Sequence, residues 1–165
     1  MRVLVTAASK HGSTFEIATA IGVELSRFGL DVTVEPVENV ESVDGYDGVV
    51  IGSGVYAGRW LGAAKEFADQ HATALALRPL WLFSSGPLGE PLKPDEDPVD
   101  AAPIASRLGA RSHQVFGGRL DRSHLGLAER AIVGLVRAPD GDYRPWDEIR
   151  SWSAEIAHDL VAGQA

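Results

Sequence analysis

The chain has 165 residues, of which 45% are hydrophobic and 23% are charged, a composition typical of a soluble globular domain. Its formal net charge of −8 argues against nucleic acid as the main partner, because binding to phosphate backbones needs clustered Lys and Arg. It contains no Cys, which excludes disulfides, thiolate nucleophiles and Cys-based metal sites. Any redox chemistry would therefore need a bound cofactor.

Residues 3–7 predict a first strand almost at the N-terminus, where a secreted protein would carry the apolar core of a signal peptide. No stretch approaches the ~18 consecutive apolar residues of a transmembrane helix. We therefore expect a cytoplasmic protein without a transmembrane segment. The length fits one domain over residues 1–165, since a chain of about 150 residues buries enough surface to form its own core.

Short runs rich in β-branched or aromatic residues alternate with longer helical segments along the chain. The predicted strands are residues 3–7, 32–34, 49–51, 80–83 and 114–116. The predicted helices are residues 14–28, 61–77, 99–108 and 146–161. This alternation predicts an α/β fold, a doubly wound parallel sheet with helices on both faces. Five strands fit the smaller doubly wound topology, with strand order 2-1-3-4-5.

Two segments interrupt the alternation. Residues 86–98 contain four prolines and several acidic residues, which predicts a solvated loop. Between the fifth strand and the last helix, residues 121–145 form a longer insertion. Apolar residues at near-helical spacing predict an extra helix there, over residues 125–137, followed by a turn at residues 138–142.

The loop after the first strand, residues 9–14, has the character of an anion-binding loop. A strand–loop–helix junction offers free backbone N–H groups and the positive end of a helix dipole. Ser9, Ser13 and Thr14 add hydroxyls, and Gly12 lets the backbone bend close to a phosphate. The alternative interpretation is that Ser13 or Thr14 only caps the helix, with Glu16 as a capping-box partner.

The loops after the third and fourth strands should lie beside the first, because ligands bind outside the carboxyl ends of the strands in such sheets. Residues 52–60 combine glycines with two aromatics, which would suit a planar ligand, although Trp60 could equally pack into the core. Residues 84–89 continue the same pattern. The candidate cofactor-binding residues of the three loops are Ser9, Lys10, His11, Gly12, Ser13, Thr14, Gly54, Val55, Tyr56, Ala57, Gly58, Trp60, Ser84, Ser85, Gly86 and Gly89.

Several other chemistries lack their motifs. The first loop is neither the G-x-G-x-x-G of dinucleotide sites nor a Walker motif, and no pair of His has the i,i+4 spacing of a helical metal site. There is no G-x-S-x-G elbow of a serine hydrolase. We therefore predict no metal and assign no catalytic side chain, so that a bound cofactor carries the chemistry.

The first loop, Ala8-Ser9-Lys10-His11-Gly12-Ser13-Thr14 followed by Glu16-Ile17-Ala18, resembles the phosphate loop of flavodoxins. More narrowly, the chain resembles the flavodoxin-like, menaquinone-dependent protoporphyrinogen oxidases over nearly its whole length. The matching segments are Ile51-Gly52-Ser53, Phe83-Ser84-Ser85, Phe116-Gly117-Gly118-Arg119-Leu120, Glu129-Arg130 and Trp146-Asp147-Glu148-Ile149 with Trp152. The resemblance implies that the first loop holds the phosphate of FMN and that the other two flank its ring.

Three functions remain open from the sequence. The resemblance favours an FMN-dependent oxidoreductase linked to a quinone and a porphyrinogen. The acidic charge would also suit a small electron carrier that docks on redox partner proteins, and a non-catalytic regulatory or interaction module is the third. The extra helix either packs on the domain or contacts a quinone, a porphyrin carboxylate or, peripherally, a membrane surface, through Leu125, Ile132, Leu135, Val136, Arg130 and Arg137.

Overall fold

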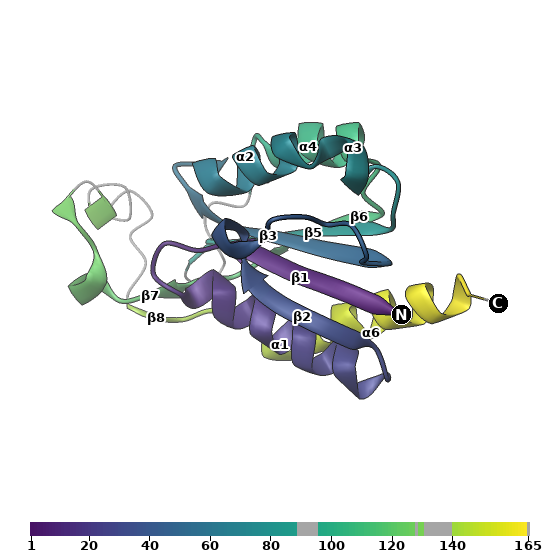
Figure 1. Ribbon diagram of the computed structural model, residues 1–165. Coiled ribbons are helices and arrows are strands. Elements are labelled where there is room, and N and C mark those ends of the chain that lie inside the picture. The colour runs from purple at the N-terminus through teal and green to yellow at the C-terminus, as the bar shows by residue number, and fades with distance from the viewer. Residues whose placement is uncertain (89–95, 128, 131–139, 165) are drawn as a thin grey trace.

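The computed structural model describes residues 1–88, 96–127, 129–130 and 140–164. Its main sheet contains five parallel strands in the order β2-β1-β3-β5-β6, as the sequence predicts. The strands are β1 (Arg2–Ala8), β2 (Asp31–Pro36), β3 (Gly48–Tyr56), β5 (Leu80–Ser85) and β6 (Ser112–Phe116). All their carboxyl ends point to one end of the molecule, where α1 begins (Figure 1).

Helices cover both faces of the sheet (Figure 1). On one face lie α1 (Ser13–Arg27) and α6 (Trp146–Ala162), and on the other lie α2 (Gly62–Gln70), α3 (Ala72–Leu75) and α4 (Ala101–Leu108). Successive strand residues point to opposite faces, so that Val3 and Val5 join the core under α1 and α6 while Leu4 joins the other. This explains why the central strands are apolar without interruption.

The predicted helix over residues 61–77 is wrong in its length. The chain leaves helical geometry at His71, with φ −106° and ψ 16°, and the short α3 follows it. The His71 ring lies against Phe67, with 4.6 Å between the ring centroids. The change of direction buries Leu75 completely and leaves Leu77 at the surface. This alanine-rich stretch has a high helix propensity throughout, yet it forms two helices because the break at His71 allows Leu75 to be buried.

Two short antiparallel pairs extend the strands at the carboxyl end of the sheet. Strand β3 turns through Ala57 and Gly58 into β4 (Arg59–Trp60), and both turn residues have positive φ, 51° and 73°. Positive φ at both positions is the geometry of a tight two-residue hairpin. The second pair joins β7 (Arg119–Leu120) to β8 (Gly141–Asp142) and closes the insertion at its base.

The predicted extra helix falls largely outside the described residues. Within the described part, Leu127, Glu129 and Arg130 are helical, and the Arg130 N–H donates to the Gly126 carbonyl at 3.0 Å. Residues 128 and 131–137 of the predicted helix lie outside it. Two single-turn 3₁₀ helices are also present, η1 (Val37–Asn39) and η2 (Arg122–His124).

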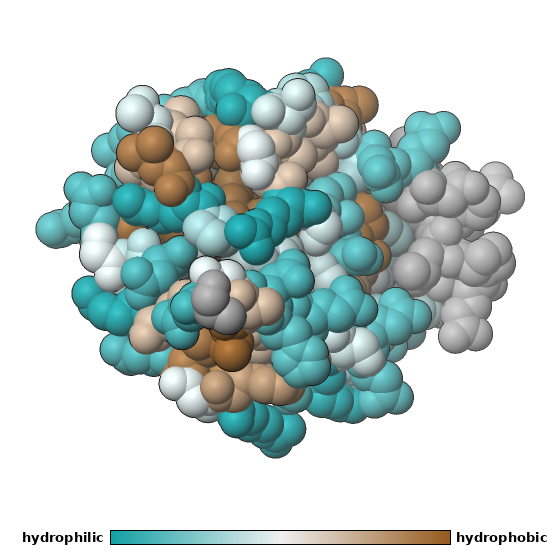
Figure 2. Space-filling model, turned by 90° about the vertical axis from the view of Figure 1, so that its right-hand side faces the viewer, coloured by the Kyte–Doolittle hydropathy of each residue, from teal (hydrophilic) through white to brown (hydrophobic). Residues whose placement is uncertain are grey.

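The end of the molecule that carries both termini is mostly polar. Figure 2 shows that hydrophilic residues dominate this face and that apolar residues form separate patches between them. No helix in the described ranges is long and apolar enough to cross a bilayer. The loops after the strands meet at the opposite end of the molecule, which is where ligands bind in sheets of this kind.

Candidate functional site

A cavity of about 740 Å³ lies at the carboxyl ends of β1, β3 and β5. Its volume falls within the range of roughly 300–1,000 Å³ that is usual for small-molecule and cofactor sites. All three predicted loops contribute to its wall. The lining residues from these loops are Ser9, His11, Ser13, Thr14, Gly54, Val55, Tyr56, Ala57, Gly58, Ser85, Gly86, Pro87 and Leu88, of which the last two were not among the predicted cofactor-binding residues.

The first loop leads into the N-terminus of α1 with the geometry of an anion site. Gly12 is the N-cap residue, with a φ of 86°, and no side chain caps the helix. The interpretation of Ser13 or Thr14 as a helix cap is therefore wrong. Ser13 lines the cavity, and its Oγ is buried and has no hydrogen-bond partner among the described residues. A buried hydroxyl without a partner is costly, and an anion at the helix N-terminus would satisfy it.

A carboxylate of the insertion, that of Glu129, contacts two side chains of the first loop. Lys10 Nζ lies 2.9 Å from Glu129 Oε1, and His11 Nε2 lies 2.6 Å from Glu129 Oε2. Hydrogen bonds from His11 and Lys10 hold the pKa of Glu129 below its usual range. Glu129 therefore fastens the insertion to the loop while the backbone of the loop stays turned to the cavity. Glu129 belongs to one of the segments that resemble the oxidase family, but its role could not be predicted from the sequence. No local pattern connects it to residues 10 and 11.

At the other end of the cavity, the third loop packs against both the β3–β4 hairpin and the loop after β6. A Cβ on Gly118 would lie 3.1 Å from the Gly86 Cα, and a Cβ on Gly86 would lie 3.0 Å from the Val55 carbonyl oxygen. On the hairpin side, Val55 and Tyr56 line the cavity together with the left-handed turn. Glycine at positions 86 and 118 thus lets the three segments approach one another closely.

Tyr56 provides a prediction for the apo protein. Burial, and secondarily the charge of Glu129, raise the pKa of its phenol from 10.0 to about 12. The folded state thus holds this proton more tightly than the unfolded state, so the stability gained from it is complete below pH 10 and is lost as the pH rises toward 12. An alkaline titration of tyrosinate absorbance should show a step near pH 12 that Tyr56→Phe removes. Identical titrations of the two proteins would contradict this assignment.

Trp60 and Ser84 were predicted to contact a cofactor, but neither residue lines the cavity. Trp60 is 3% exposed, and its Nε1 donates to Ser84 Oγ at 2.8 Å. Ser84 Oγ also lies 2.7 Å from His113 Nε2, and burial lowers the pKa of His113. The alternative interpretation of Trp60 as a core residue is confirmed. Lys10 and Gly12 are not lining residues either, and Gly89 lies outside the described residues.

The sequence interpretation missed about half of the cavity wall. The loop after β6 contributes Gly118, Arg119 and Leu120, and the segment before α4 contributes residues 96–99. Ligands bind beyond the carboxyl ends of the strands, and this rule applies to the fifth strand as well. It would have predicted that the loop after β6 contributes to the cavity. Apolar side chains dominate this half, with Leu88 and Leu120 packed against Leu125. Within the described ranges, no three His, Asp or Glu are grouped in a way that could hold a metal ion.

Comparisons with known proteins agree with this geometry. A family model described as the flavodoxin domain matches residues 4–145. Protoporphyrinogen IX dehydrogenase (quinone) from Escherichia coli (strain K12) is 26% identical over 96% of this chain and 96% of its own length.

Solved structures share the fold at lower identity. A flavodoxin from the domain Archaea is 19% identical with a TM-score of 0.65, covering 97% of this chain and 99% of that one. The rubredoxin oxygen:oxidoreductase of Desulfovibrio gigas is 13% identical with a TM-score of 0.69, covering 99% of this chain and 37% of that one. Since the flavodoxin domain model spans most of its length, the chain belongs to the flavodoxin family, which indicates FMN as its cofactor.

Proposed function

We propose that this protein is an FMN-dependent oxidoreductase that links a porphyrinogen-like substrate to a quinone. The observation that carries the proposal is Ser13 at the N-terminus of α1, which lines the cavity and whose buried hydroxyl lacks a partner among the described residues. The match to a quinone-linked protoporphyrinogen IX dehydrogenase over 96% of both chains supports the choice of substrates.

The chain's own residues would bind and orient the cofactor. Ser9, Ser13, Thr14 and the backbone N–H groups of the first loop would hold the phosphate. The β3–β4 hairpin and the Ser85-Gly86 backbone would border the ring, and their peptide groups would tune its edge. When bound, the flavin supplies the capacity to accept and donate electrons or hydride. No side chain is proposed as an obligatory acid or base.

The apolar half of the cavity would exclude water from the ring and receive a second, apolar molecule. Leu88 and Leu120 lie in this part, and Val99, at its border, is 59% exposed. Leu127, close in sequence to the lining residue Leu125, is 88% exposed. Apolar groups at the mouth of the cavity are consistent with a quinone and with peripheral contact with a membrane surface.

Binding of FMN is the first test. Addition of FMN to apo protein should quench flavin fluorescence and raise the melting temperature, since a ligand at 100 times its Kd stabilises by about 2.7 kcal/mol. For a chain of this length that corresponds to a shift of roughly 5–10 °C. Unchanged fluorescence together with an unchanged melting temperature would contradict the proposal at its first step.

A second candidate is an electron carrier that docks on partner proteins. The net charge of −8 favours it, because acidic surfaces steer encounters with basic partners. Steady-state turnover separates the two candidates. The oxidoreductase should oxidise protoporphyrinogen with a quinone as acceptor in the absence of other proteins. A carrier would show no such turnover and would transfer electrons only to a partner protein, at a rate that falls as ionic strength rises.

A further inference from the structure

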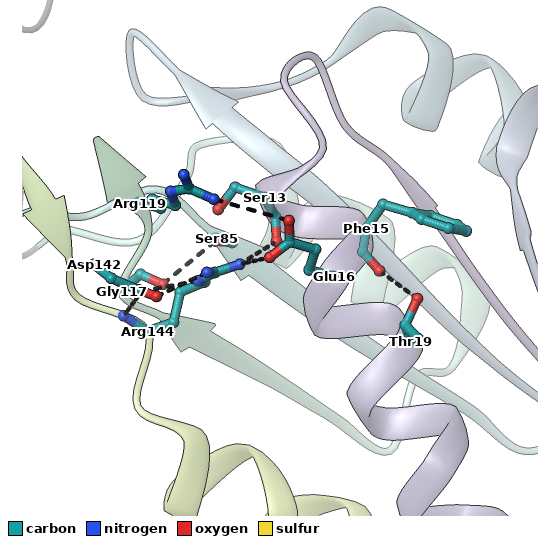
Figure 3. A network of polar contacts seen from close by, with 9 residues as sticks. All are labelled: Ser13, Phe15, Glu16, Thr19, Ser85, Gly117, Arg119, Asp142 and Arg144. Atoms are coloured by element: carbon teal, nitrogen blue, oxygen red, sulfur yellow. Dashed lines mark hydrogen bonds and ion pairs between the residues drawn. The ribbon is translucent and has the colours of Figure 1, made fainter. Parts of the chain in front are cut away.

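The guanidinium of Arg144 is buried against the first turn of α1, far from its own position in the sequence. Its side chain is 5% exposed. Nη1 donates to Glu16 Oε2 at 2.6 Å and to the Ser13 carbonyl at 3.3 Å. Nε and Nη2 donate to both carboxylate oxygens of Asp142, at 2.8 and 2.7 Å. Figure 3 shows this guanidinium between the β8 strand and the start of α1.

A cation in this place is electrostatically unusual. The N-terminus of a helix carries partial positive charge, so a guanidinium beside it is unfavourable unless carboxylates compensate it. Glu16 and Asp142 provide that compensation, and Arg119 Nη1 lies 3.9 Å from the second oxygen of Glu16. Two guanidiniums and two carboxylates thus surround the beginning of α1. The formal charges within this cluster balance, so the cluster adds no net negative charge beside the positive end of the helix dipole.

The contact with Ser13 connects this cluster to the cavity. Arg144 holds the carbonyl of Ser13, a residue that lines the cavity and whose buried hydroxyl lacks a partner in the described part of the chain. This contact holds the Ser13 peptide and the first turn of α1, from which the side chain projects. The ring of Trp146, 4.6 Å from the guanidinium carbon, limits the freedom of Arg144 itself. The backbone at the start of α1 is therefore preorganised before any ligand arrives.

We propose that Arg144 is a positioning residue for the phosphate of FMN, acting through Ser13 and Glu16. The inference rests on the proposed FMN site and adds a role for the base of the insertion. Arg144 follows β8 directly, so the return of the insertion to the sheet sets the geometry of the phosphate loop. Arg144 does not line the cavity, so it would act on the phosphate without contacting it.

Comparison of FMN with riboflavin isolates this role, because riboflavin has the same ring and ribityl chain but no phosphate. In apo protein, Arg144→Met should weaken FMN binding at least 10-fold and change riboflavin binding less than 2-fold. Arg144→Lys, which retains the charge but loses the bidentate grip, should give an intermediate loss for FMN. Arg150→Met is the matched control. It removes an exposed guanidinium that pairs with Asp147 on α6, and it should change neither affinity.

The ratio of the affinities for FMN and riboflavin also distinguishes a positioning role from a purely structural one. Equal losses for FMN and riboflavin in Arg144→Met would overturn the inference, and so would an unchanged FMN affinity. If Arg144→Met does not fold, Asp142→Asn replaces it, because that side chain is 42% exposed and its removal leaves Arg144 paired with Glu16. A selective loss of FMN is expected there too. A wild-type protein that binds both flavins equally would instead contradict the phosphate site of the proposed function.

Discussion

Ser13→Asp is expected to abolish FMN binding. The substitution places a carboxylate at Ser13, a residue that lines the cavity at the N-terminus of α1 and whose hydroxyl is buried. Two unit charges of like sign at 4 Å repel by about 4 kcal/mol at an effective dielectric constant of about 20. That energy corresponds to a loss of roughly 1,000-fold in affinity. Titration with FMN, followed by quenching of flavin fluorescence, measures it directly.

Two controls make the result specific for charge. Ser13→Ala removes only a hydrogen bond, worth about 0.5–1.5 kcal/mol, and should weaken FMN binding by no more than roughly 10-fold. Riboflavin, which has no phosphate, should bind Ser13→Asp nearly as well as wild-type protein. An FMN affinity in Ser13→Asp equal to that of Ser13→Ala would show that the phosphate lies elsewhere.

Gly52→Ala should destabilise the protein by about 3 kcal/mol or more, at the upper end of the usual cost of overpacking. A Cβ at this position of β3 would lie 2.0 Å from the Phe83 Cζ and within 2.5 Å of both Cε atoms. The Phe83 ring cannot retreat easily, because it is fully buried and packs against Phe116 and Trp152, with ring centroids 6.2 and 6.3 Å away. Urea unfolding of the apo protein gives the change in the free energy of unfolding.

Gly62→Ala is the matched control for this substitution. Gly62 is the first residue of α2, and a Cβ there meets no atom within 4 Å. Its replacement should leave stability unchanged or raise it by up to about 1 kcal/mol. Gly52→Ala combined with Phe83→Leu should recover part of the loss, since a smaller side chain makes room for the new methyl group. Equal stabilities of Gly52→Ala and wild type would contradict the packing seen around Phe83.

The fold could be predicted because its signals are local, and the proposed phosphate end of the site rests on signals of the same kind. Apolar runs of strand length, helical spacing between them and a hydroxyl-rich loop after the first strand each lie within a few consecutive residues. The parallel order then follows from chain topology, and the meeting of the loops follows from the order. The flavodoxin-like sheet and the anion site at Ser13 both rest on such signals.

The missed parts depend on contacts between distant residues. Glu129 meets His11 across 118 positions, and Arg144 meets Ser13 across 131. A single sequence contains no pattern that pairs them. Trp60 illustrates a second limit, because an aromatic residue beside a glycine-rich turn fits a ring-stacking role and a core role equally well. Only the bond from its indole N–H to Ser84 separates the two.

Because β7 pairs with β8, the segment between these two strands could be replaced without altering the rest of the fold. Arg119 pairs with Asp142 and Leu120 with Gly141, so the chain leaves the frame and returns to it at one point. A two-residue turn could replace residues 121–140 without changing the path of the five-stranded sheet. Such a shortened chain would lose the Glu129 carboxylate from the phosphate loop but keep Arg144. Exchange of residues 121–140 for other segments would therefore change which molecules reach the proposed flavin site. The five-stranded sheet and the proposed phosphate site would stay the same.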